Sequence, residues 1–161
     1  METFIEGTFR FMMYMLFGLT METLTAIHGI DAFLGFKVHR RVPKKYLEGF
    51  VSAYMIPLHG FGILFLFEAA LPYVSDLHIV LRYLLYAGLI SFMEVAWGYF
   101  LDKTLGFYPW DYYAESKYRT SSRAATLCTL VPAWGVAGLV LEVYVGLMQH
   151  LAPYVSEYFL M

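Results

Sequence analysis

Residues 79–101 read IVLRYLLYAGLISFMEVAWGYFL, an apolar stretch with one carboxylate, Glu94, inside it. Three other long apolar stretches follow the same design and carry Glu22, Glu68 and Glu142. A charged side chain at the centre of a bilayer costs about 2.5–3.5 kcal/mol on insertion scales. We therefore expect the four carboxylates to face one another or a wet cavity, and the interior of a helix bundle is the first place to look for function.

The composition excludes an ordinary soluble domain. The chain is 60% hydrophobic and 15% charged, whereas soluble domains are about 45–50% apolar and about 25% charged. This excess of apolar surface indicates a polytopic membrane protein. The net charge is −2 and no long basic patch is present, which excludes nucleic acid as a partner. Cys128 is the single cysteine, so no intramolecular disulfide forms.

The pattern predicts an all-α integral membrane protein, one domain over residues 1–161 with four transmembrane helices. The predicted spans cover about residues 9–34, 49–74, 79–101 and 124–150. Each is long enough for a tilted helix that rises about 1.5 Å per residue.

The basic residues predict the orientation. Nine of the eleven Lys and Arg residues lie in the two long connections, 36–48 and 102–123. The positive-inside rule then puts both connections in the cytoplasm and both termini outside. The basic run 37–45 has two open roles, contact with anionic membrane lipid and docking of a soluble partner.

The two halves of the sequence look alike. The tetrapeptide PLHG at 57–60 precedes Glu68, and PAWG at 132–135 precedes Glu142. A repeat of two helical hairpins in one orientation would be related by an axis along the membrane normal. The prolines would then kink their helices at matched depth. The alternative is a chance match, since proline and glycine are common in membrane helices.

If the repeat is real, Glu22 faces Glu94 in the cytoplasmic half or at the midplane, and Glu68 faces Glu142 in the outer half. Together with His59 these are the candidate residues of a substrate or ion pathway. Three roles stay open for the carboxylates: a cation or proton relay, structural hydrogen bonding in the protonated form, and metal coordination.

Few residue patterns that are typical of cofactor sites occur in the sequence. No Glu-x-x-His pair exists, so the di-iron carboxylate signature is absent. His28 and His59 are the histidines well inside spans, and a haem between them is an alternative to simple bonding with a neighbouring helix. No Gly-x-x-x-x-Gly-Lys-Ser/Thr loop occurs, so any ATPase would be a separate chain. We expect no cofactor.

Several motifs carry a family resemblance. In chain order they are Tyr14-x-x-x-Gly18-x-x-x-Glu22, Pro57-x-x-Gly60, Glu94-x-x-x-Gly98, Trp110-Asp111-Tyr112 and Trp134…Glu142. The set resembles the Putative ABC-transporter type IV permease family over about residues 14–144, which implies a compact polytopic membrane protein. Two departures stand out: His59 replaces the usual tyrosine, and residues 113–118 lack an asparagine- and glycine-rich turn.

Trp110, Asp111 and Tyr112 form the most specific of these motifs. In a structural role, Asp111 caps the loop or accepts hydrogen bonds from Arg119 or Arg123, while the two aromatic residues anchor it among the lipid headgroups. In a functional role, the motif is a cytoplasmic gate, or a contact for a partner chain, below Glu22 and Glu94.

Three functions are compatible with this sequence. The first is a permease-like subunit for a small solute or ion, with Glu22 and Glu94 as an inner site and Glu68 and Glu142 as an outer site. Four helices leave little room for a pore, so homo-oligomers or other membrane subunits are expected. The second is a non-transporting accessory subunit of a membrane complex. The third is an intramembrane enzyme acting on lipid with a glutamate as base, and an enzyme is not the favoured class.

Overall fold

The computed structural model describes residues 1–39, 47–107, 109–120 and 126–161. The described residues form helices and their connections, and no strand forms among them. The elements are α1 (Glu2–His28), α2 (Ile30–Leu34), η2 (Ala53–Met55), η3 (Leu58–Phe67), α3 (Glu68–Val74), α4 (Ile79–Leu105), η4 (Asp111–Glu115) and α5 (Val131–Leu160). The all-α prediction is therefore confirmed.

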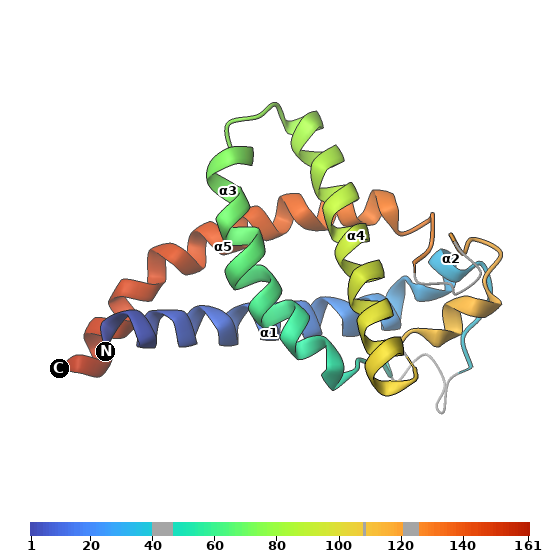
Figure 1. Ribbon diagram of the computed structural model, residues 1–161, viewed down its shortest axis with the longest axis horizontal. Coiled ribbons are helices and arrows are strands. Elements are labelled where there is room, and N and C mark those ends of the chain that lie inside the picture. The colour runs from blue at the N-terminus through green and yellow to red at the C-terminus, as the bar shows by residue number, and fades with distance from the viewer. Residues whose placement is uncertain (40–46, 108, 121–125) are drawn as a thin grey trace.

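Two helical hairpins pack on each other. The first hairpin is α1 with η3 and α3, and the second is α4 with α5. α1 and α5 lie along each other, so that the two chain termini meet at one end of the molecule (Figure 1). α3 and α4 are joined by a short turn and cross over this long pair (Figure 1).

The predicted number of four membrane spans needs correction. Within the described residues, three helices are long and apolar enough to cross a membrane: Ala53–Val74, Ile79–Leu105 and Val131–Leu160. These helices agree with the second, third and fourth predicted spans in place, although not in every boundary.

The first predicted span, 9–34, is not among these three long and apolar helices. α1 has 27 residues, but it begins at Glu2 and carries four charged side chains. These are Glu2, Glu6, Arg10 and Glu22. The helix also ends at His28, and Gly29 separates it from the short α2. The accepted span α4 also has four charged side chains, so the difference lies in the second half of α1, where Thr20, Glu22, Thr23, Thr25 and His28 lower the mean hydropathy.

The fourth span, predicted over 124–150, starts later and ends later. α5 runs from Val131 to Leu160 and passes through Pro153. Ala152 and Ser156 are 1% and 0% exposed, because this end of α5 packs along α1. Packing against α1 therefore stabilises α5 beyond residue 150, where the span predicted from the sequence ended.

The two predicted proline kinks have different outcomes. Pro132 is the second residue of α5. A proline in the first turn removes an N–H that has no partner inside the helix, so it starts a helix without bending it, and the kink predicted at Pro132 is wrong. Pro57 is the fifth residue of the helix Ala53–Val74 and directly precedes the π-helix η3, and the kink predicted there stays a prediction. The two prolines still occupy matching places in the two hairpins.

Large apolar side chains point outward from the bundle. Phe65, Phe92 and Val143 are 63%, 66% and 75% exposed, while the polar Ser156 is fully buried. An exterior of this kind is costly in water and suits lipid or partner chains. The protein is therefore an integral membrane protein by its composition and its surface.

Candidate carboxylate sites

Glu68 is held by two residues of α1. Arg10 Nη1 donates to Oε2 of Glu68, and the Tyr14 hydroxyl donates to Oε1. Arg10 and Tyr14 are four residues apart, so they share one face of the helix. The side chains of Arg10 and Glu68 are 21% and 11% exposed. The carboxylate is thus neutralised inside the first hairpin.

Glu142 is held in the same way in the second hairpin. Arg82 Nη1 donates to Oε1 of Glu142, and the Tyr86 hydroxyl donates to Oε2 at 2.8 Å. Arg82 and Tyr86 are again four residues apart. We call the two sets (Arg10, Tyr14 and Glu68; Arg82, Tyr86 and Glu142) the arginine clusters.

Sequence reasoning missed both arginines as site residues, since they were counted only for topology. A signal was present: α1 and α4 both read Arg-x-x-x-Tyr followed eight residues later by Glu, at Glu22 and Glu94. The prediction that Glu68 faces Glu142 did not consider these partners. Among the described contacts, each carboxylate bonds within its own hairpin, and a stacked Phe67–Tyr86 pair with ring centroids 5.2 Å apart lies between the hairpins.

Glu22 meets His59 at the other end of the first hairpin. Glu22 Oε1 lies 3.0 Å from His59 Nε2, and the two side chains are 27% and 19% exposed. His59 packs directly on Gly18 of α1, where an added Cβ would lie 2.2 Å from the imidazole Cγ. Glycine at position 18 therefore permits this contact.

Glu94 is more deeply enclosed and has three donors. It is 7% exposed. The indole Nε1 of Trp134 donates to it at 3.1 Å, the Tyr113 hydroxyl donates at 3.3 Å, and the Thr126 hydroxyl completes the set. Because a buried carboxylate is costly unless its oxygens are bonded, this arrangement fixes Glu94 in place.

The inner glutamates, Glu22 and Glu94, thus meet matching residues. His59 and Trp134 each lie two residues after the matching proline and directly before a glycine. Those glycines, Gly60 and Gly135, each accept an aromatic ring of the hairpin's first helix: an added Cβ would lie 2.2 Å from Phe11 and 2.4 Å from Tyr83, respectively.

The Trp110 motif lies over the inner end of the second hairpin. Trp110 is 5% exposed, and an added Cβ at Gly98 would lie 2.9 Å from its ring. Trp110 is therefore buried in the protein. Asp111 is exposed, and Arg119 donates to the carbonyl of Ala114. Arg123, the other predicted partner of Asp111, lies outside the described residues.

Tyr112 and Tyr113 bring this connection close to both inner glutamates. Burial raises the pKa of Tyr112 well above its usual range, and the charges of Glu22 and Glu94 add to the effect. Burial and the charge of Glu94 likewise raise the pKa of Tyr113. Both phenols therefore remain protonated at neutral pH, and Tyr113 donates its hydroxyl proton to Glu94.

Across the residues that the structure describes, no group of three His, Cys, Asp or Glu side chains could hold a metal ion. His28 is exposed at the end of α1, and His59 is engaged with Glu22.

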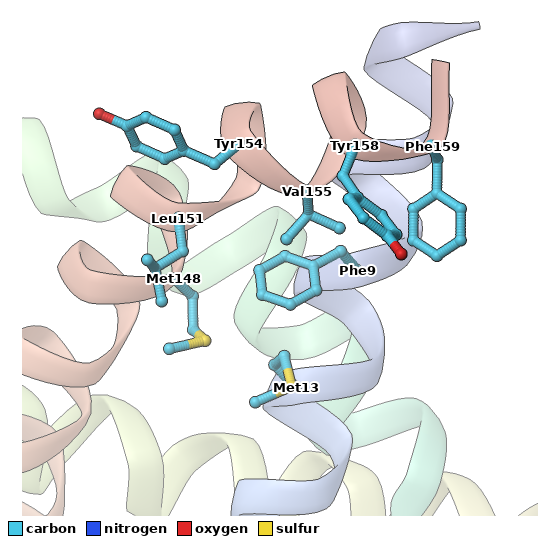
Figure 2. A pocket seen from close by; sticks show the side chains of 8 residues that line it. All are labelled: Phe9, Met13, Met148, Leu151, Tyr154, Val155, Tyr158 and Phe159. Carbon is cyan, nitrogen blue, oxygen red and sulfur yellow. The ribbon is translucent and has the colours of Figure 1, made fainter. Parts of the chain in front are cut away.

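An open apolar groove lies away from the carboxylates. It encloses about 510 Å³ between the start of α1 and the end of α5, where Phe9, Met13, Met148 and Tyr158 line it (Figure 2). The other lining residues are Leu151, Tyr154, Val155 and Phe159. No carboxylate lines this groove, so it is separate from the candidate sites.

The comparison with known proteins gives one match. A family model with the description Putative ABC-transporter type IV matches residues 9–160. No curated protein and no solved structure matches the chain significantly. The matched region covers nearly the whole chain, including both hairpins and both inner glutamates. The predicted resemblance is thus confirmed, and the chain belongs to the Putative ABC-transporter type IV family.

Proposed function

We propose that the chain is a permease-like membrane subunit for a small solute or ion, which acts together with further chains. One observation carries the proposal: the carboxylates of the long helices are partnered inside the bundle, while large apolar side chains cover its outside. The family name supports the transporter class. The sequence holds no phosphate-binding loop, so an ATP-driven assembly would take its ATPase from another chain.

We infer that α1 lies in the membrane beside α5. Its Arg10 and Glu22 are paired within the first hairpin, which lowers the cost of placing them in an apolar environment. Membrane lipid then surrounds a bundle whose termini share one side. The positive-inside rule favours the outside for the termini and the cytoplasm for connections 36–48 and 102–123, parts of which lie outside the described residues.

We also infer that the two hairpins are copies of one structural repeat. The arginine clusters, the matching prolines and the glycines that accept an aromatic ring support this. Each hairpin would then contribute one outer glutamate that is paired with an arginine, Glu68 or Glu142, and one inner glutamate, Glu22 or Glu94. The outer glutamates stabilise the bundle. The inner glutamates and His59 form the pathway, and the Trp110 motif lies at its cytoplasmic side.

The test measures both the subunit composition of the assembly and its transport of a solute. Native mass spectrometry of the protein extracted gently from its own membrane should show stoichiometric membrane subunits or an ATPase. The purified assembly, in proteoliposomes, should lose solute movement in the Glu22→Gln variant while its subunit composition stays unchanged. A chain that purifies alone as monomer or homodimer and moves no solute would contradict the proposal.

A non-transporting accessory subunit is the second candidate. It is favoured by the intrachain partners of Glu68 and Glu142, because each carboxylate is already paired with an arginine and a tyrosine of its own hairpin. In that case the Glu22→Gln variant leaves transport by the assembly unchanged, and substitutions on the exposed apolar faces release the subunit. The two candidates therefore predict opposite results for the same variant.

A further inference from the structure

The Glu22–His59 pair is the place where a carboxylate meets a group that both accepts and donates protons. A neutral imidazole carries one N–H and one bare nitrogen. If the N–H on Nε2 donates to Glu22 Oε1 across the 3.0 Å contact, Nδ1 is left as the bare nitrogen. Histidine changes charge nearest to physiological pH among the unperturbed side chains.

Gly18 lets His59 approach α1 closely. A Cβ at position 18 would lie 2.4 Å from His59 Nδ1, so any larger residue would press on this nitrogen or displace the ring. Both partners of the pair also keep exposed surface, 19% for His59 and 27% for Glu22.

The helix that carries His59 has a local irregularity at this point. Residues Leu58–Phe67 form a π-helix, and such wide turns are frequent at functional sites. The corresponding part of α5, which starts at Val131, is regular α-helix. The π-helix therefore distinguishes the His59 side of the bundle from the Trp134 side.

The second hairpin offers an internal reference. At the matching position Trp134 donates its indole N–H to Glu94, and an indole neither gains nor loses a proton at accessible pH. Glu94 is also enclosed by Tyr113 and Thr126. The same carboxylate position is therefore built twice, once with a proton acceptor beside it and once without.

Other titratable groups near the pair come from two packed elements. Tyr112 of η4 lies within reach of the charge of Glu22, and its raised pKa keeps it protonated. Glu94 of α4 also interacts electrostatically with Glu22. Within the described residues, the groups available for proton exchange here are Glu22, His59 and Glu94, and Glu94 is the one already enclosed by three donors.

We propose that Glu22 and His59 form a proton-exchanging site. A proton from water adds to Nδ1 of neutral His59 and forms one N–H bond, while Nε2–H stays on Glu22. The charge of the pair changes from −1 to 0, and release of the same proton to water restores it. This inference deepens the proposed function and rests on it for the use of the proton in moving a solute.

The experiment measures His59 directly, without substrate or partner. The full chain, labelled with ¹⁵N-histidine, is placed in phosphatidylcholine nanodiscs, and the imidazole signals are followed by NMR from about pH 4.5 to about pH 9. His59→Gln assigns the signals among the five histidines. We expect His59 to change protonation in this range and Glu22→Gln to shift its midpoint by about one pH unit or more. Glu6→Gln, a carboxylate variant of the same helix, should leave the midpoint unchanged.

Two results would overturn the inference. One is a His59 whose ring signals stay constant over the whole range in the unaltered protein, a result that requires no variant to fold. The other is a midpoint that is identical with and without Glu22. The outcome is separable from that of the proposed function: a titrating His59 in an assembly that moves no solute contradicts only the permease, and a silent His59 in an active permease contradicts only this inference.

Discussion

The two hairpins agree at one end and differ at the other. In each, an arginine of the first helix neutralises a glutamate of the second, and a tyrosine four residues after the arginine donates a hydrogen bond to the same glutamate. At the other end, Glu22 is paired with a partly exposed histidine, whereas Glu94 is buried and accepts hydrogen bonds from three donors. The arginine clusters explain how the bundle tolerates buried charge. The different surroundings of Glu22 and Glu94 show where the two hairpins differ in chemistry.

The Trp110 motif accounts for much of this difference. Tyr113 and Thr126 both come from the connection between α4 and α5 and bond to Glu94. The same connection is tied to the end of α2, because Ser116 and Thr129 donate to the carbonyls of Leu34 and Phe33, each at 2.7 Å. The loop therefore closes the second hairpin and links it to the first.

The largest expected effect comes from breaking an arginine cluster. Arg10→Met and Arg82→Met each leave a mostly buried carboxylate without its counter-charge, which costs about 3–5 kcal/mol when a buried pair is broken. If the hairpins are equivalent, the two losses are similar in unfolding measurements in lipid or detergent.

A matched rescue sharpens this prediction. Adding Glu142→Leu to Arg82→Met removes the unpaired charge and should recover most of the lost stability, since an apolar pair often replaces a buried ion pair without loss. A destabilisation in one hairpin only would break the equivalence of the two arginine clusters.

The inner glutamates should respond unequally. Glu94→Gln weakens three hydrogen bonds to a charged acceptor and should cost about 2 kcal/mol, while Glu22→Gln affects one and should cost about 1 kcal/mol or less. Hydrogen exchange should also speed up in residues 110–116 of the first variant alone. Equal losses in the two variants, with no change in exchange, would mean that the donors around Glu94 carry no additional stability.

The close helix contacts should again respond alike. Gly60→Ala and Gly135→Ala place a methyl group against Phe11 and Tyr83, and such overpacking costs about 1–3 kcal/mol. Gly146→Ala is the control, because nothing lies within 4 Å of an added Cβ there, and its thermal unfolding temperature should not fall. A control as damaging as the two variants would show that the loss of glycine itself, and not the ring contact, is responsible.

The smallest effect is expected from a single hydroxyl. Tyr113→Phe removes one donor from Glu94 and should cost about 1 kcal/mol. Tyr83→Phe removes the more exposed bond to the Pro132 carbonyl, 3.1 Å long, and should cost less. The comparison is made by equilibrium unfolding of the two variants under one condition, and a larger loss for Tyr83→Phe would contradict the burial of the Glu94 site.

The sequence predicted the helical class and three of the spans, because hydrophobic length is a local signal. It also singled out the four glutamates, whose role in a pathway stays a prediction. It did not predict the break at Gly29. It also did not predict the extension of α5 beyond residue 150, which depends on packing between α5 and α1. Arg10 and Arg82 were overlooked because a charge near a span end also has an ordinary topological explanation. The donors Thr126 and Tyr113 come from a connection whose path no periodicity reveals.

The most direct test of the matched hairpins is a pair of double-mutant cycles, Arg10 with Glu68 and Arg82 with Glu142, measured by reversible unfolding in one detergent. Each cycle isolates the coupling energy of its own pair. The account predicts two favourable couplings that agree within about 0.5 kcal/mol. Couplings that differ by about 2 kcal/mol or more, or a pair with none, would contradict the claim that the two hairpins are held by the same arginine cluster.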